Sequence, residues 1–274
     1  MGLYDTIILS TPINCVKCGN PIKKFQTKAF ENALNSYRIG DVVNYMCSSR
    51  VISGILEDGL YCRECESFDQ LVYMVIYHMI LIGVCGDKVK AHQKLREMNR
   101  ADLIALYGAL RQRKKLWKAK YKRLHYLVDS YRSYLHDGQI ESTDLMDCLQ
   151  AKEVLTCILK KVRQEKNQID EREGSQDLNK DLDKADILDL YYELHKQMDD
   201  WRRKFSGLCR LIGSYQEYLN MSEEEREKRR SSAFGALAFH DIEECLKRED
   251  VLGCLLEEAE KGRGWPFFGD EDLD

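Results

Sequence analysis

The sequence predicts a mainly α-helical protein: a helical bundle with coiled-coil-like heptad packing, preceded by a small β-rich unit. Three observations support this fold class: the scarcity of proline, three heptad patterns of apolar residues, and a change of pattern near residue 66. The chain has 274 residues and three prolines, and no proline lies between Pro21 and Pro266. Chains built from many short strands and turns usually contain more proline, so most of this chain is expected to be helical.

Residues 1–66 are predicted to form the β-rich domain. Short runs of strand-forming residues, such as 6–9 and 24–27, alternate with glycines. The pair Asp58-Gly59 predicts a hairpin turn, because glycine accepts the positive φ that tight hairpin turns require. The first domain is therefore expected to consist of short strands joined by tight turns.

Residues 67–263 are predicted to form the helical bundle. The longest apolar run, residues 71–85, is fifteen residues long and contains His78. A membrane span needs about 20 apolar residues, so this run predicts a buried helix and no membrane segment. Apolar residues then recur in steps of three and four over residues 103–135, 148–169 and 187–219, a pattern that packs helices side by side. Loops are expected at 136–144 and 172–177, and Ser222 with Glu225 predicts a capping box.

Two CxxC pairs are the most specific feature of the sequence. Cys15 and Cys18 form the first pair, and Cys62 and Cys65 form the second, with forty-three residues between the pairs. Each pair can place two thiolates on one tetrahedral ion, and Gly19 lets the chain fold back so that backbone N–H groups point at the sulfurs. We predict one structural Zn²⁺ held by the four cysteines. Four protein ligands leave no open position for water, so such a site serves folding and not hydrolysis.

Other interpretations of the cysteines stay open. The same four ligands suit an iron–sulfur site, a CxxC pair can be a redox motif, and the thiols can be unligated. Redox CxxC pairs usually open a helix in a βαβ context, which is not expected here. If one of the four metal ligands is replaced, Cys47 is the nearest other thiol. The remaining cysteines are predicted to be small core residues on helices. They are Cys85, Cys148, Cys157, Cys209, Cys245 and Cys254.

Several short pieces of the first 66 residues carry a family resemblance. They are MGLYD (1–5), CVKCG (15–19), FQTK (25–28), LNSYRIGD (34–41) and CREC (62–65). Together they resemble small uncharacterised zinc-ribbon proteins of bacteriophages and prokaryotic mobile elements. The resemblance implies a four-cysteine metal site in a zinc ribbon and a phage, mobile-element or host-defence setting, and it implies no activity.

A basic segment at 111–123 is a candidate nucleic-acid interface. The net charge of −4 argues against a protein that binds nucleic acid over its whole surface, but residues 87–125 contain thirteen Lys and Arg against three Asp and Glu. Trp117 and Tyr121 interleave with the cations, although both fall on heptad positions, which favours a place in the core. The alternative is that the cations pair with acidic helices of the same chain. The candidate residues are Arg111, Arg113, Lys114, Lys115, Lys118, Lys120, Lys122 and Arg123.

Residues 264–274, GWPFFGDEDLD, are predicted to be an acidic aromatic tail that docks a partner through Trp265, Phe267 and Phe268. The alternative is that these rings pack back onto the helices. No catalytic residues are predicted, because the histidines are scattered and HExxH, GxSxG and Gly-rich phosphate loops are absent from the sequence. His195, beside acidic residues, is expected to be a surface histidine.

The function expected from these features is that of a non-enzymatic zinc-binding scaffold or regulatory protein that docks a macromolecular partner, most simply a protein. The first alternative is a nucleic-acid-binding protein that uses the β-rich domain and the basic segment 111–123. The second is an enzyme with a site assembled from distant helical residues. The first ten residues lack the pattern of a secretory signal peptide, so we expect a cytoplasmic protein, where thiols stay reduced and CxxC pairs bind metals.

Overall fold

The structure is a computed structural model that describes residues 3–43, 53–138, 143–164, 182–230 and 242–261. These residues divide into two compact units. The first unit contains strands β1–β6, helix α1 and the starts of α2 (Arg100–Asp137) and α5 (Lys184–Asn220), which leave the unit after Gln112 and Lys196. The second unit contains the remaining parts of α2 and α5 and the other helices.

The first sheet of the first unit has the strand order β2-β1-β3. Strand β1 (Asp5–Asn14) pairs antiparallel with β2 (Pro21–Thr27) and parallel with the short β3 (Ser36–Tyr37). We call β1 and β2 the first hairpin. The chain before β3 is held by the buried Asp5, whose carboxylate accepts hydrogen bonds from three backbone N–H groups. The donors are Asn32 (2.7 Å), Ala33 (3.0 Å) and Asn35 (2.9 Å).

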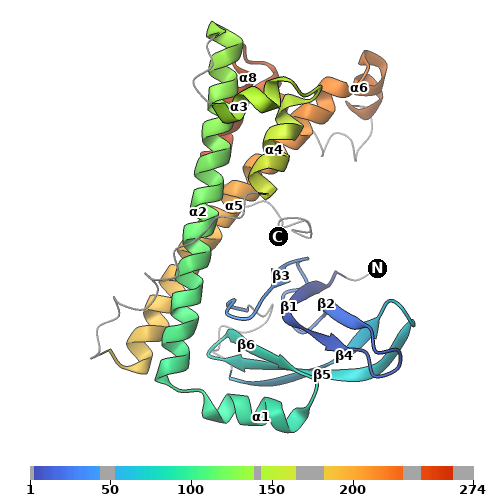
Figure 1. Ribbon diagram of the computed structural model, residues 1–274, viewed down its shortest axis with the longest axis vertical. Helices are drawn as coiled ribbons and strands as arrows, with labels where there is room; N and C mark the ends of the chain where they lie inside the picture. Colours follow the sequence, from blue (N-terminus) through green and yellow to red (C-terminus); the bar gives the residue numbers. More distant parts are fainter. Residues whose placement is uncertain (1–2, 44–52, 139–142, 165–181, 231–241, 262–274) are drawn as a thin grey trace. The chain divides into compact units, whose positions relative to one another are not determined.

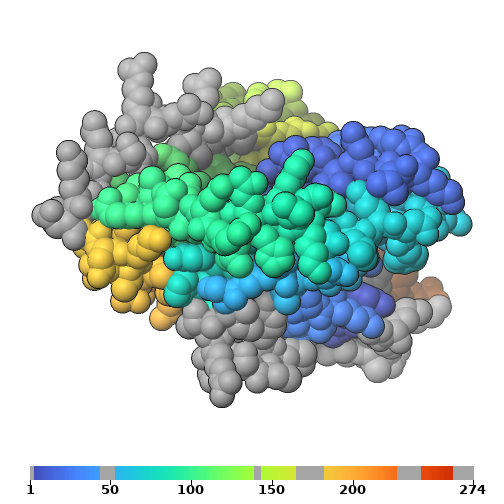
Figure 2. All heavy atoms as spheres, turned by 90° about the horizontal axis from the view of Figure 1, so that it is seen from below, coloured from blue at the N-terminus to red at the C-terminus, as the bar shows by residue number. Residues whose placement is uncertain are grey.

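The second sheet is an antiparallel meander in the order β4-β5-β6. Its strands are β4 (Gly54–Cys62), β5 (Ser67–Tyr77) and β6 (Ile80–Cys85). We call β4 and β5 the second hairpin. Helix α1 (Lys88–Glu97) contacts all three strands of this sheet, and Figures 1 and 2 show it beside the cyan and teal strand residues. A single apolar core joins the two sheets, with Ile7 and Phe25 from the first and Leu60 and Met74 from the second.

The predicted fold class, a mainly α-helical bundle after a small β-rich zinc ribbon, is wrong. Residues 71–85 are not a buried helix but most of β5 and all of β6, so the strands reach Cys85 and the architecture mixes α and β structure. The reason lies in the burial of β5. Met74 and Ile76 face the core between the sheets, and Val75 is fully buried as well, in a strand that α1 covers. Where a strand is buried on both faces, its sequence is a continuous apolar run. The spacing of apolar residues alone does not distinguish such a run from a buried helix.

The turns of the second sheet also differ from those expected. The β5–β6 connection is the two-residue turn His78-Met79, which the pair Tyr77 and Ile80 flanks. Both turn residues have positive φ, 45° and 61°, as a type I′ hairpin turn requires. His78 is therefore a turn residue and not part of a buried helix. The predicted turn at Asp58-Gly59 is wrong, because both residues lie inside β4 and pair with β5.

The start of α5 is fixed to the first unit by polar side chains. The Tyr191 hydroxyl donates to the carbonyl of Gly40, and the Tyr192 hydroxyl donates to the carbonyl of His78 at 2.5 Å. The backbone N–H of Val42 donates to Nε2 of His195 at 3.2 Å. His195 is therefore a partner of the β-rich region and not the surface histidine that we expected.

The second unit is helical. Between α2 and α5, Trp117 lies against Phe205 and Tyr121 against Trp201, with ring centroids 5.6 and 5.7 Å apart. At the edges of the predicted loop 136–144, α2 ends at Asp137 and α3 begins at Thr143, and residues 139–142 lie outside the described residues. The unit also contains α3 (Thr143–Leu149), α4 (Val154–Gln164), α6 (Glu223–Arg230), the helical residues 242–246 and α8 (Val251–Glu260). Across the parts of the chain that the structure describes, no helix is both long and apolar enough to cross a membrane.

The predicted capping box of α6 is confirmed. The Ser222 hydroxyl accepts from the N–H of Glu225 at 3.3 Å, and the Glu225 carboxylate accepts from the N–H of Ser222 at 2.9 Å. The other predicted loop, at 172–177, lies outside the described residues, as do the last positions of the second heptad pattern.

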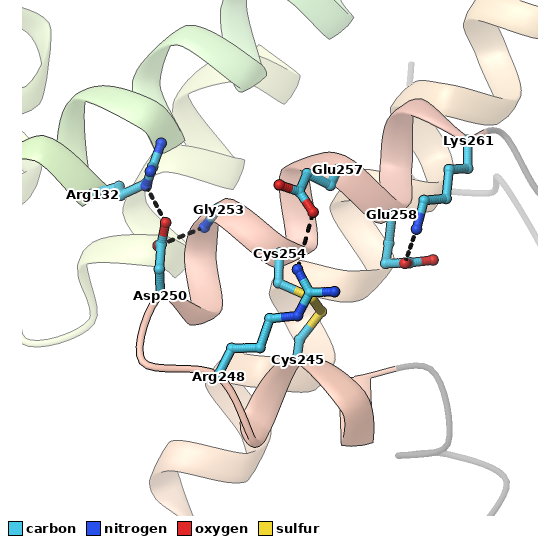
Figure 3. Close-up of polar contacts among 9 residues, drawn as sticks. All are labelled: Arg132, Cys245, Arg248, Asp250, Gly253, Cys254, Glu257, Glu258 and Lys261. Carbon is cyan, nitrogen blue, oxygen red and sulfur yellow. Dashed lines mark hydrogen bonds and ion pairs between the residues drawn. A yellow bond between two sulfur atoms is a disulfide. The ribbon is translucent and has the colours of Figure 1, made fainter.

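A disulfide joins the helical residues 242–246 to α8 (Figure 3). Cys245 and Cys254, both buried, are bonded to each other with their Cα atoms 5.4 Å apart. Asp250 caps α8 by accepting from the N–H of Gly253 at 2.9 Å, and its carboxylate lies 2.7 Å from the guanidinium of Arg132. Two of the cysteines that we predicted to be isolated core residues are therefore a covalent pair.

Candidate metal centre

Two hairpin turns, one from each sheet, place the four CxxC cysteines. Cys15 directly follows β1, and Cys18 lies in the turn that leads to β2. Cys62 is the last residue of β4, and Cys65 lies in the turn that leads to β5. Each pair thus occupies the connection of one hairpin, and both connections belong to the first unit.

The first turn folds back beneath its cysteines. The N–H of Gly19 donates to the carbonyl of Cys15 at 2.9 Å, and the N–H of Cys15 donates to the carbonyl of Asn20 at 2.9 Å. Gly19 has φ of +75°, a region that residues with a Cβ rarely adopt. This is the role predicted for Gly19. In the second turn Glu66, with φ of 51°, occupies the left-handed region instead.

The four sulfur atoms lie at distances that suit one metal ion. Sγ of Cys15 is 3.6 Å from Sγ of Cys65, and Sγ of Cys18 is 3.6 Å from Sγ of Cys62. All four sulfurs lie within 4.8 Å of one another. A tetrahedron with Zn–S bonds of about 2.3 Å has S···S edges of about 3.8 Å, whereas a disulfide has about 2.05 Å. The four cysteines can therefore hold one ion. Each of the two 3.6 Å distances lies between a sulfur of one hairpin and a sulfur of the other.

The thiols of the first turn differ in acidity. Backbone N–H groups of Cys18 and Lys17 direct hydrogen bonds at the Cys15 sulfur and lower the pKa of that thiol to about 6. A backbone hydrogen bond from Asn20 acts in the same direction on Cys18, but partial desolvation of its sulfur by the surrounding protein and hydrogen bonds with the three neighbouring thiols outweigh it and raise the pKa of Cys18 to about 12. Cys15 is thus held toward the thiolate, which is the form that binds metals.

Gln70 ties the second hairpin to the first turn. Its side-chain carbonyl accepts from the N–H of Val16 at 3.1 Å, and its amide donates to the carbonyl of Asn14 at 3.3 Å. Because Gln70 belongs to β5, this side chain fixes the two cysteine turns relative to each other. Sequence analysis missed it, since no residue pattern relates a glutamine after the second pair to the backbone of the first.

One side of the cysteine cluster is packed and the other faces solvent. Cys15 and Cys62 are buried in the core that joins the two sheets, whereas Cys18 is exposed and Cys65 is half-buried. The hydroxyl of Ser67 lies 3.5 Å from Sγ of Cys65. The candidate replacement ligand Cys47 lies outside the described residues.

The basic segment 111–123 makes contacts within its own chain. Lys114 donates to the side chain of Gln197 at 2.5 Å, and Arg123 forms an ion pair with Asp144. Lys120 is buried, with its Nζ 5.3 Å from the ring centre of Trp117. Both rings pack against α5, where Tyr121 is buried, as the prediction of a core position requires, and Trp117 is half-buried. The remaining candidates, Arg111, Arg113, Lys115, Lys118 and Lys122, are half-buried or exposed.

The tail residues Trp265, Phe267 and Phe268 lie outside the described residues, so their docking role stays a prediction.

In comparisons with known proteins, no family model, no curated protein and no solved structure matches this chain.

Proposed function

We propose that the chain is a non-enzymatic scaffold in which one structural Zn²⁺, held by Cys15, Cys18, Cys62 and Cys65, joins two hairpins into a docking head for a macromolecular partner. The observation that carries the proposal is the closeness of four sulfurs from two different sheets. Zn²⁺ suits them because it binds four thiolates tetrahedrally without preference for another geometry. The resemblance to phage and mobile-element zinc ribbons supports the same metal and setting. The free thiols of the cluster favour a reducing compartment such as the cytoplasm, whereas the Cys245–Cys254 disulfide favours an oxidising one.

The proposed ion would act on stability. In the described residues, no backbone ladder joins the strands of the two sheets. The apolar core, the Gln70 side chain, the hydrogen bond from Thr27 of β2 to Asp58 of β4 and the thiol cluster connect them, and the chain after β3 bonds to the backbone of β6. A cross-link between Cys18 and Cys62 would close a loop of forty-three residues, which restricts the unfolded chain. Metal binding in small zinc domains is strongly coupled to folding, so removal of the ion should loosen both hairpins.

Exposed apolar side chains beside the cysteine turns support a docking role. Val16, inside the first CxxC pair, has 69% of its surface exposed, and Phe68, next to the second turn, has 68%. Contiguous apolar surface that a chain leaves in water often marks an interaction site. The nucleic-acid role of the basic segment 111–123 stays a prediction, since no contact described here favours it.

The test is metal analysis of the full chain purified without added metal. We expect about one zinc per chain, an amount that falls sharply in Cys15→Ser and Cys62→Ser and stays unchanged in the matched control Cys85→Ser, a half-buried cysteine outside the cluster. Less than about half a zinc ion per chain in fresh wild-type protein would contradict the proposal. Visible absorption together with iron and sulfide would identify an iron–sulfur site instead. If the Ser variants do not fold, the metal content of the wild-type protein decides alone.

A further inference from the structure

A hollow of about 210 Å³ lies in the first unit, between the strands of the two hairpins. Tyr4, Thr6 and Lys24 line it from the first hairpin and the residue before it, and Tyr61, Arg63 and Phe68 line it from the second hairpin and its turn. Pockets for drug-sized ligands usually measure about 300–1,000 Å³, so this one suits a single flat ring better than a whole cofactor. We call it the aromatic groove.

The rings of the aromatic groove form a platform that is open to solvent. The ring centres of Tyr61 and Phe68 are 4.5 Å apart, and their planes are inclined by 32°. Phe68 leaves 68% of its surface exposed, and Tyr61 and Tyr4 each leave 37%. Neighbouring rings that present a flat apolar surface to water are well suited to stack against another planar group.

Two of the residues that line the aromatic groove are cations. Lys24 and Arg63 line it, and none of the lining residues described here carries a carboxylate. At its margin, Nζ of Lys28 lies 4.7 Å from the ring centre of Tyr4. A ligand that complements this surface has planar rings and negative charges at short intervals, which is the chemistry of a nucleic-acid strand whose bases are unpaired.

We propose that the aromatic groove binds single-stranded nucleic acid, with one or two bases stacked on Phe68 and Tyr61 and phosphates beside Lys24 and Arg63. The inference rests on the proposed function, because the ion would hold together the two hairpins that form the groove. It deepens that function by giving the partner a chemical class. A double helix is a poor fit, since its base faces are stacked inside the duplex. A proline-rich peptide would use the rings but not the cations.

The test measures fluorescence anisotropy of a labelled single-stranded oligothymidylate of about 15 nucleotides with the full zinc-containing chain. A duplex of the same length and a proline-rich peptide serve as competing probes. The variants are Phe68→Ala and Lys24→Gln. Their matched controls are Tyr126→Ala, which removes an exposed ring from α2, and Lys23→Gln, which removes the same charge from the neighbouring residue outside the groove. Zinc content is measured for every variant.

We expect the single strand to bind and the duplex and peptide to bind much more weakly. Phe68→Ala should weaken binding about tenfold, the loss typical of one stacked base, with unchanged zinc content, while Tyr126→Ala has no effect. Two phosphate contacts predict that raising salt from about 50 to about 200 mM weakens binding about sevenfold, and Lys24→Gln, but not Lys23→Gln, should reduce that dependence.

Three outcomes would overturn the inference: no binding of the single strand at about 50 mM salt, binding that Phe68→Ala and Lys24→Gln leave unchanged, or preference for the duplex or the peptide. Zinc content separates this inference from the proposed function. A chain with a full complement of zinc and no oligonucleotide binding refutes only the groove. Groove-dependent binding by a chain without zinc refutes only the metal.

Discussion

Replacement of Gln70 by alanine should weaken metal binding without removing a ligand. The side chain makes two hydrogen bonds to the backbone on either side of Cys15, at 3.1 Å to Val16 and 3.3 Å to Asn14. Both bonds are exposed to solvent, so each contributes about 0.5–1 kcal/mol. If their sum of about 1–2 kcal/mol serves to position the two turns, the affinity for Zn²⁺ falls about 5- to 30-fold, which overlaps the loss of about 10- to 100-fold seen for residues that support metal ligands.

The assay is competition for Zn²⁺ between the protein and a chromophoric chelator at constant pH. Gln93→Ala is the matched control, because Gln93 is an exposed glutamine on α1 whose side chain bonds to Glu97 and not to the cysteine turns. We expect Gln70→Ala to bind one ion with reduced affinity and Gln93→Ala to match the wild-type protein. An unchanged affinity for Gln70→Ala would refute the view that this side chain sets the distance between the turns.

Two further predictions concern groups away from the metal. Asp5→Ala should destabilise the first unit by about 3–5 kcal/mol, because three backbone N–H groups lose a charged acceptor. The measurement is amide hydrogen exchange, which should become faster at Asn32, Ala33 and Asn35. Unchanged exchange at these residues would contradict the prediction. Reduction of the Cys245–Cys254 disulfide should lower the stability of the second unit by about 2–3 kcal/mol, the entropy expected for a short loop. Thermal unfolding with and without reductant measures this loss of stability. The double variant with Cys245→Ala and Cys254→Ala is the control, and its midpoint should not respond to reductant. An unfolding midpoint of the wild-type protein that reductant leaves unchanged would contradict the prediction.

The cysteine cluster was predictable because its geometry is largely local. A CxxC spacing places two thiols on one side of a tight turn, and Gly19 supplies the positive φ that the first turn needs. Which sulfur of the first turn lies beside which sulfur of the second was not derivable from the spacing. It depends on the core between two separate sheets and on the Gln70 bridge, which are long-range features of the fold.

The error over residues 71–85 has a physical cause. Sequence period identifies a strand when one face is polar, but the consecutive residues Met74, Val75 and Ile76 of β5 are all fully buried, so that apolar residues follow one another there without interruption. The turn that interrupts the run is His78-Met79, which lacks the Asn-Gly or Gly residues typical of a type I′ turn. Its conformation has support from a distant element, since the Tyr192 hydroxyl of α5 bonds to the carbonyl of His78.

The capping box at Ser222 and the end of α2 were predicted correctly because both are set within four or five residues. The disulfide was not, because nine positions separate Cys245 and Cys254, and the turn between them brings their Cα atoms to 5.4 Å. Features fixed by neighbouring residues were thus visible in the sequence, whereas features fixed by contacts between elements were not.

The central claim is that one zinc ion is bound by four sulfurs from two hairpins. X-ray absorption at the zinc edge of the purified full chain tests it most directly. We predict a single shell of about four sulfur neighbours at about 2.3 Å, with no nitrogen or oxygen ligand. A zinc shell that contains nitrogen or oxygen, or fewer than about four sulfurs, would contradict the claim.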